Sequence, residues 1–272
     1  MKRAYPVVAI LGVLALVMTL SVDTARPSAV VRVIDNTVAS HPNALWHIVH
    51  DLCVIDMKVS HRPAPCAVVN RAGGYAILKD IHGGTQFLLI PTARLAGIES
   101  PELLEPSSHN YWRQAWNSRS WLEKQAGRPV PREDIGLAIN SAYGRTQNQL
   151  HIHVDCVQPD LAAAIKTHGD RIGLRWSNWD VAFNGHHYRV RWVDGADLGA
   201  RDPFKLLARG DPDARADMSR ETLVMVGASR ADGTPGFVLL SDRADLSGED
   251  TAEGEELLDH KCTVLKPTPP AP

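Results

Sequence analysis

The chain has 272 residues, of which 44% are hydrophobic, and this is enough for one substantial core. Its formal net charge is −2 and its lysines and arginines form no block, so nothing points to a nucleic-acid partner. Charged residues make up 22% and are spread along the chain, which argues against an intrinsically disordered protein.

The N-terminus carries a targeting segment. Ala4 to Val22 is a run of 19 residues without a charge, and Lys2 and Arg3 precede it. Such a run is either a secretory signal or a membrane anchor, and the lack of a good cleavage site favours an anchor over residues 1–25. The positive flank stays in the cytoplasm, so the body of the protein is expected to cross the membrane. Residues 26–42 are then a linker, 43–265 the main domain and 266–272 a disordered tail.

The spacing of apolar residues predicts both helices and strands. Helices are expected over residues 43–56, 107–125 (capped by Ser107 or Ser108), 159–167 and 251–260. Strands are expected over residues 74–81, 86–91, 134–140, 150–156, 186–193, 222–229 and 236–241. Strands mixed with segregated helices favour an α+β fold, with flanking helices around an antiparallel sheet.

The most informative stretch is residues 138–156, whose second half alternates strictly. Its apolar set is Leu150, Ile152 and Val154, and its polar set is Gln149, His151, His153 and Asp155. A period of two predicts a strand with one face in the core and the other free for chemistry. Two imidazoles on that face, beside a donor-rich turn at residues 144–148, suit metal binding, attack on phosphorus or proton transfer.

The four cysteines agree with export. An even number in an exported chain suggests two disulfides, for which three pairings are possible. We favour Cys53–Cys66, which closes a short loop, together with Cys156–Cys262, which ties the C-terminal segment to the histidine-bearing strand. Such a cross-link stabilises by roughly 2–4 kcal/mol. A zinc site is the alternative, although no Cys-x-x-Cys spacing occurs.

Residues 145–156 resemble the signature of the histidine-triad superfamily, which is His-x-His-x-His on a strand behind a short donor loop. Here Gln149 takes the place of the first histidine, and His151 and His153 follow. More specifically, the chain is similar to bacterial CDP-diacylglycerol pyrophosphatases from about residue 44 to 262. The matching segments are the N-terminal anchor, residues 76–80, 86–91, 94–101, 145–156 and 259–262, with all four cysteines.

The resemblance implies hydrolysis of CDP-diacylglycerol to CMP and phosphatidate. His151 would attack the phosphorus that bears cytidine and form a nucleotidyl-histidine, because a neutral imidazole is a good nucleophile near pH 7. His153 would hold phosphoryl oxygens or pass a proton to the departing oxygen, and Gln149 would orient groups by hydrogen bonding. The implied substrate contacts are Asp80 to the ribose, Ile81 beside the base, Lys79 and Arg94 to the diphosphate, Asn140 and Thr146 to phosphate, and Gln86 within the 86–91 motif.

The same resemblance implies a setting. No metal cofactor is required by this scheme, and no nucleic acid or obligate protein partner is expected. The lipid substrate stays in the bilayer, so the domain is expected on the periplasmic side of a bacterial inner membrane, held there by residues 1–25.

Two other functions remain open. The first is a related enzyme that acts on a soluble nucleotide. The second is an exported metal-binding module, in which His151 and His153 bind zinc and the pair His186-His187 supplies a third ligand.

Overall fold

The computed structural model describes residues 41–248 and 250–265. The expected anchor, nearly all of the linker and the expected tail therefore lie outside the described residues. Within the described part of the chain, no helix is both long enough and apolar enough to span a bilayer.

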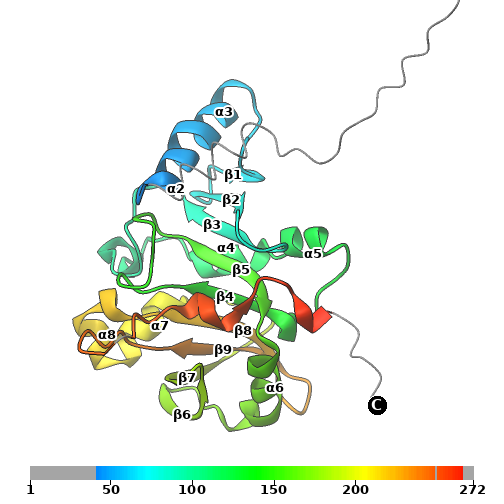
Figure 1. Cartoon of the computed structure of the whole chain (residues 1–272), viewed down its shortest axis with the longest axis vertical. Coiled ribbons are helices and arrows are strands. Elements are labelled where there is room, and N and C mark those ends of the chain that lie inside the picture. Colours follow the sequence, from blue (N-terminus) through cyan, green and yellow to red (C-terminus); the bar gives the residue numbers. More distant parts are fainter. Residues whose placement is uncertain (1–40, 249, 266–272) are drawn as a thin grey trace, which may run out of the picture.

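A single large antiparallel sheet forms the centre of the molecule (Figure 1), which confirms the expected α+β fold. Its strand order is β1-β2-β3-β5-β4-β8-β9-β7-β6, and β10 pairs with β5 off this path. The strands are β1 (Val68–Asn70), β2 (Tyr75–Lys79), β3 (Phe87–Pro91), β4 (Ile135–Ile139), β5 (Ile152–Val157), β6 (Ser177–Phe183), β7 (His186–Asp194), β8 (Leu223–Ser229), β9 (Pro235–Ser241) and β10 (Leu258–Asp259).

Helices cover both faces of this sheet. The chain first forms one continuous helical segment over residues 44–59, here called the N-terminal helix, which consists of α2 (Ala44–His47), η1 (Ile48–Cys53) and α3 (Val54–Val59). The other α-helices are α4 (Tyr111–Asn117), α5 (Ser120–Ala126), α6 (Pro159–His168), α7 (Pro203–Gly210) and α8 (Pro212–Ala216). Short 3-10 turns are η2 (Pro101–Leu104), η3 (Arg132–Asp134), η4 (Gly169–Arg171), η5 (Met218–Arg220), η6 (Gly254–Leu257) and η7 (Thr263–Leu265).

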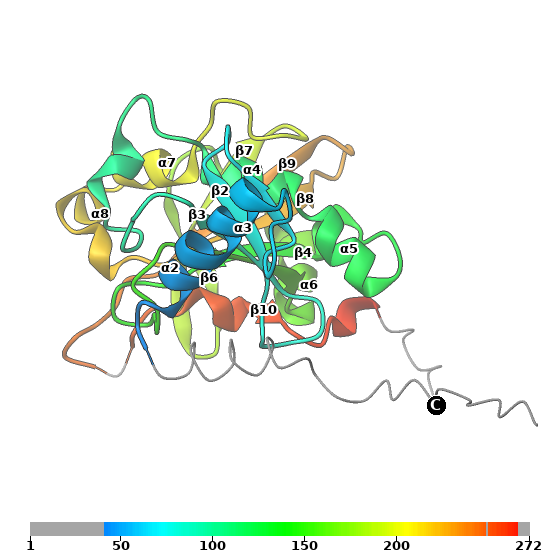
Figure 2. The same ribbon diagram turned by 90° about the horizontal axis from the view of Figure 1, so that it is seen from above.

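The two faces of the sheet bury different hydrophobic clusters. One face, here called the α4 face, packs against Trp112 and Trp116 of α4 and Phe204 of α7. The opposite face, here called the α6 face, is covered in two separate places. The N-terminal helix covers β1 to β3 at one end of the sheet, and α6 packs on the strands at the other end (Figures 1 and 2).

Two expected helices differ from the structure. The helix expected over residues 107–125 is two helices, α4 and α5, and Asn110 caps α4 by accepting a hydrogen bond from the backbone N–H of Arg113. The prediction of a helix over residues 251–260 is wrong. That segment forms η6 and then β10, because Leu258 and Asp259 find strand partners in Val157 and Cys156 of β5.

Both favoured disulfides are present. Cys53 bonds to Cys66 with a Cα–Cα distance of 5.7 Å, and Cys156 bonds to Cys262 with a Cα–Cα distance of 5.1 Å. The first joins the N-terminal helix to the segment before β1. The second ties the segment after β10 to β5.

Removing the first disulfide should destabilise the protein without disturbing the sheet. The Cys53→Ser/Cys66→Ser variant should lose about 2–3 kcal/mol of unfolding free energy, because the cross-link closes a loop of 13 residues. Urea unfolding followed by far-UV circular dichroism measures this loss. An unchanged unfolding free energy would show that the cross-link adds nothing to stability.

Candidate active site

The paired histidines lie at a seam on the α6 face. His153 pairs with Leu88 on one side and with Ala138 on the other. Leu88 belongs to the cluster under the N-terminal helix, whereas Ala138 belongs to the cluster under α6. His153 therefore occupies the place where the two covering layers meet.

A cavity of about 150 Å³ opens at this seam. Its lining is Leu45, Leu78, Lys79, Asp80, Ile81, His82, Leu88, Asn140, Gly144, Thr146, Gln147, His151, His153, Glu253 and Glu255. The alternation along β5 divides as expected, because Ile152 and Val154 are in the cluster of the α4 face. The other face is not open, however, since every residue of β5 is buried. The N-terminal helix, through Leu45, and the C-terminal segment, through Glu253 and Glu255, form part of the cavity wall, and the cavity is partly open to solvent.

His151 is held in one tautomer. Its Nδ1 lies 2.7 Å from the backbone carbonyl oxygen of Gln149, which can only accept, so Nδ1–H donates and the lone pair is on Nε2. Burial lowers the pKa of this imidazole to about 4, and repulsion from the neighbouring His153 adds to the effect. The ring is therefore neutral near pH 7 and presents a nucleophilic nitrogen.

His153 contacts a carboxylate and lies beside an amide. Its Nδ1 lies 3.2 Å from Glu255 Oε1 and 2.8 Å from Gln86 Nε2. The two amide hydrogens of Gln86 have acceptors in Asp80 Oδ2 at 2.6 Å and Glu255 Oε1 at 3.0 Å. We infer that Nδ1 of His153 carries its own hydrogen and donates it to Glu255. Its Nε2 is buried and has no partner among the described residues, an arrangement that suits contact with a ligand.

One group at this site has the composition of a metal site. Ligand atoms of Asp80, His153 and Glu255 lie within 4.8 Å of one another. The Gln86 amide nitrogen lies at 2.6, 2.8 and 3.0 Å from those atoms and fills the space between them. Because an amide N–H group is a donor and not a ligand, these residues fit a hydrogen-bonded cluster better than an ion.

Gln149 is placed differently from its expected role. Its Nε2 donates to the backbone oxygens of Pro91 at 3.0 Å and Ala93 at 2.9 Å, and the residue is fully buried. The side chain therefore fixes the end of β3, and the residue serves His151 through its backbone oxygen. Orientation of substrate by its amide N–H groups has no support in this geometry.

Arg94 is not brought to the cavity. It is exposed, its guanidinium donates to the side chain of Asn43, and it stacks over Trp46 with a distance of 5.2 Å to the ring centroid. These contacts fasten the start of the N-terminal helix to the segment after β3. The expected contact of Arg94 with a diphosphate therefore has no support in its position.

The other expected substrate contacts do line the cavity, apart from the fully buried Gln86 in its hydrogen-bonded cluster. Lys79 Nζ donates to the backbone oxygens of Asp80 at 2.8 Å and Gly83 at 3.1 Å, and burial lowers the pKa of its ammonium. Asn140 Oδ1 accepts from the backbone N–H of Glu255 at 3.0 Å, which leaves its Nδ2 group as a donor. Ile81 and Thr146 reach the same space.

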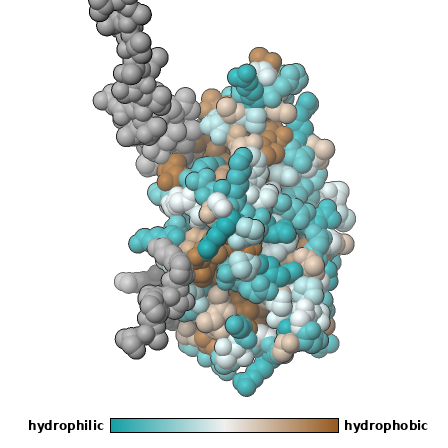
Figure 3. Space-filling model, turned by 90° about the vertical axis from the view of Figure 1, so that its right-hand side faces the viewer, coloured by the Kyte–Doolittle hydropathy of each residue, from teal (hydrophilic) through white to brown (hydrophobic). Residues whose placement is uncertain are grey.

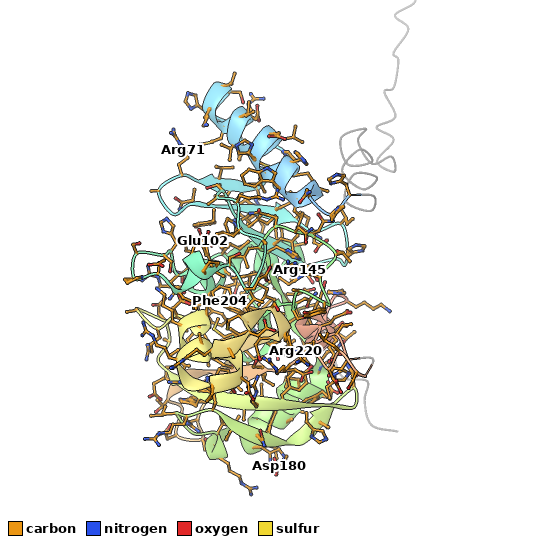
Figure 4. The ribbon with its side chains drawn as sticks, turned by 90° about the vertical axis from the view of Figure 1, so that its left-hand side faces the viewer. Arg71, Glu102, Arg145, Asp180, Phe204 and Arg220 are labelled. Atoms are coloured by element: carbon orange, nitrogen blue, oxygen red, sulfur yellow. A yellow bond between two sulfur atoms is a disulfide. The ribbon has the colours of Figure 1, made fainter. Side chains whose placement is uncertain are left out.

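The donor-rich turn at residues 144–148 serves mainly as a clamp. Arg145, labelled in Figure 4, makes a bidentate pair with Glu99 at 2.6 and 2.7 Å. Gln147 accepts from the backbone N–H of Leu45 at 3.2 Å. The donors of this turn are thus largely used within the protein. The exposed hydroxyl of Thr146 lies on the cavity wall.

The structure does not bring His186 to the pair of histidines. Its Nδ1 contacts Asp242 at 3.2 Å and Asp250 at 3.0 Å. Three strands, β4, β8 and β9, separate its strand β7 from β5, which amounts to roughly 19 Å at about 4.8 Å per strand. A zinc site shared with His151 and His153 therefore lacks its expected third ligand.

Several site residues were not predicted from the sequence. They are Leu45, His82, Glu253, Glu255 and the nearby His260. Glu255 and His260 belong to the segment expected as a helix, in which no periodic pattern distinguished them. The matching segment at residues 259–262 was the available signal for His260, but it was assigned only the role of carrying Cys262.

Comparison with known proteins agrees with this geometry. The sequence model of the family described as CDP-diacylglycerol pyrophosphatase matches residues 40–266. A protein of Yersinia pestis named CDP-diacylglycerol pyrophosphatase is 41% identical over 230 residues, which are 85% of this chain and 88% of that protein. The residues matched by the family model include the whole cavity and both disulfides. The chain therefore belongs to the CDP-diacylglycerol pyrophosphatase family.

Proposed function

We propose that this protein hydrolyses CDP-diacylglycerol to CMP and phosphatidate through a nucleotidyl-histidine intermediate on His151. Membership of the family supports the reaction and the substrate. The observation that carries the mechanism is the fixed tautomer of His151, whose Nδ1–H donates to the Gln149 backbone oxygen at 2.7 Å. A neutral imidazole whose Nε2 carries the lone pair, on the wall of a partly open cavity, is suited to attack on phosphorus.

The reaction proceeds in two displacements. In the first, His151 Nε2 forms a bond to the phosphorus that bears cytidine, while the bond from that phosphorus to the bridging oxygen breaks. Phosphatidate leaves with the bonding electron pair. In the second, water attacks the same phosphorus and releases one proton, the phosphorus–nitrogen bond breaks, and CMP leaves. His151 regains its lone pair, so two easier steps replace one difficult hydrolysis.

His153 acts on the oxygen atoms in this scheme. Its Nε2 is buried without a partner in the described structure. The ring centroids of His151 and His153 are 4.9 Å apart. When Nε2 also carries a proton, the ring is a cation whose Nδ1–H is held by Glu255, and the Nε2–H stabilises the phosphoryl oxygens and the departing bridging oxygen as negative charge develops. The Nδ2 group of Asn140 and the hydroxyl of Thr146 add further donors from the cavity wall.

We also propose that the domain works at the extracytoplasmic surface of a membrane and that residues 1–25 anchor it there. The uncharged run Ala4 to Val22 supports this proposal, and so does a substrate with two acyl chains. The N-terminal helix follows this run in the chain and exposes Leu52, Ile55 and Val59, with 78% exposure for Val59. Figure 3 shows apolar side chains reaching the surface in patches.

Substrate comparison tests the proposed reaction. Purified protein in detergent should release CMP from CDP-diacylglycerol and be far slower on CDP-choline and ATP. Preference for the soluble nucleotides would replace the lipid substrate with a soluble one. Stoichiometric zinc in the purified protein, without hydrolysis of any of the three, would favour a metal-binding module instead.

The acid limb of the pH profile should lie unusually low. Since the pKa of His151 is lowered to about 4, the neutral nucleophile persists as the pH falls from 7 to about 5 and is lost only near pH 4. Accordingly, kcat/KM on CDP-diacylglycerol should stay nearly flat down to about pH 5. Circular dichroism at each pH separates this loss from acid unfolding. A midpoint near 6.5 in folded protein would contradict a buried, neutral His151.

A further inference from the structure

We propose that Glu255 and His260, both from the C-terminal segment, are positioning residues that act on the reaction through His153. This inference rests on the proposed function and goes beyond it. Glu255 holds Nδ1 of His153 and so aims Nε2 at the substrate. His260, fixed by the buried Asp155, in turn holds Glu255.

Glu255 is the junction of the network. Its Oε1 lies 3.2 Å from His153 Nδ1, 3.4 Å from His260 Nε2 and 3.0 Å from Gln86 Nε2. Burial opposes ionisation of this carboxyl, but the two histidines and the amide outweigh it, so that its pKa is below its ordinary value. Glu255 is therefore a carboxylate at neutral pH and accepts from all three groups.

His260 bridges two carboxylates. Its Nδ1 lies 3.0 Å from Asp155 Oδ2 and its Nε2 lies 3.4 Å from Glu255 Oε1. The hydrogen bond that His260 donates to Asp155 raises the pKa of His260, burial opposes this rise, and the charge of Glu255 adds to it. Asp155 is fully buried and fixed by the Thr85 hydroxyl at 2.6 Å, so it is a rigid support for the ring.

Three features hold this segment in place. The pairing of β10 with β5 puts Asp259 opposite Cys156, directly beside Asp155. The disulfide Cys156–Cys262 closes the far side of His260. Gly83, at φ 70°, lets the loop after β2 approach, because a Cβ there would lie 2.7 Å from His260 Cβ. The cross-link thus helps to hold His260 and Glu255 at the cavity, so the disulfide has a role in the site as well as in stability.

The decisive variant is Glu255→Gln. It keeps the shape of the side chain and removes its charge, so kcat should fall by about 10–100-fold with little change in KM. That range is typical of outer partners that orient a histidine at a metal site. Glu256→Gln is the matched control, because Glu256 lies next to it in η6 and accepts instead from the Tyr188 hydroxyl at 2.5 Å. The control should keep wild-type kcat.

A double-mutant cycle separates positioning from general damage. In the His153→Ala background, Glu255→Gln should change kcat by less than about 2-fold, because its effect passes through His153. An undiminished loss in that background, or equal losses from Glu255→Gln and Glu256→Gln, would overturn the inference.

A spectroscopic readout tests the inference apart from the reaction. Nitrogen-15 shifts of the His153 ring should show Nδ1 protonated and hydrogen-bonded to a carboxylate in the wild-type protein, and this hydrogen bond should be weaker in Glu255→Gln. This outcome supports the network even if the wild type prefers a substrate other than CDP-diacylglycerol, which would sink only the proposed function. A ring state that is identical in both proteins would overturn the inference.

The role of His260 has its own signature. The charged groups that act on it are Asp155 on β5, Glu255 on η6 and Asp80 just after β2, and Lys79 acts on Asp80 and Asp155. As the pH rises above its raised pKa, His260 loses its proton, and kcat should fall, which gives the pH profile an alkaline limb. The variant His260→Gln should lack this limb and have a kcat about 10-fold lower than the wild type. Lys261→Gln, at the exposed next residue, is the control and should keep the wild-type profile. An unchanged limb in His260→Gln would exclude His260.

Discussion

Replacing His151 with alanine should lower kcat on CDP-diacylglycerol by at least about 10⁴-fold, because the variant has no nucleophile to carry the cytidylyl group. The fold should survive, since His151 precedes β5 and the core contacts of that strand come from Ile152 and Val154. CMP release under saturating substrate measures the loss. His187→Ala, at an exposed position of β7, is the matched control and should keep wild-type activity.

A folded His151→Ala protein with wild-type kcat would leave the reaction in place and exclude His151 as the nucleophile. An activity only 10-fold lower would point instead to direct attack by water, with His151 as an orienting group. Thermal melting of both variants separates these outcomes from simple unfolding.

Replacing His153 with alanine should lower kcat by about 10³-fold and change KM much less. Its Nε2 is a buried group without a partner in the described structure, and its contribution grows as charge develops on the phosphoryl and leaving oxygens. His153→Gln should lose less, since its amide can place a donor near the same point. Steady-state kinetics of the two variants test the difference.

Equal losses in kcat for alanine and glutamine would show that donation from this position does not matter. A rise in KM at constant kcat would assign His153 to ground-state binding of the substrate. Either result would remove it from stabilisation of the transition state.

The strand that carries the chemistry could be predicted because its pattern is local. Alternation from Leu150 to Val154 predicts which side chains enter the α4 face, and the register with β3 and β4 confirms it. The short loop between Cys53 and Cys66 likewise favoured the observed pairing. The resemblance to the histidine-triad superfamily stays a prediction, because the family match names only CDP-diacylglycerol pyrophosphatases.

The part of the site that comes from the C-terminal segment could not be predicted, since it depends on contacts between distant parts of the chain. Glu255 meets Gln86 across 169 residues, and His260 meets Asp155 across 105. Residues 254–259 were expected to be helical, but pairing of β10 with β5 and the disulfide at Cys262 override that local pattern. Gln149 and Arg94 were assigned to substrate from the resemblance, but Gln149 donates to backbone oxygens after β3 and Arg94 lies outside the cavity, where it donates to Asn43.

The central claim is a covalent bond between His151 and the cytidylyl phosphorus. Brief incubation with CDP-diacylglycerol labelled at that phosphorus, followed by denaturation, tests it most directly. We expect acid-labile label on the wild-type protein, located on His151, and none on His151→Ala. An active wild type that carries no label on its histidines at any quench time, or label on His151→Ala equal to the wild type, would contradict the nucleotidyl-histidine mechanism.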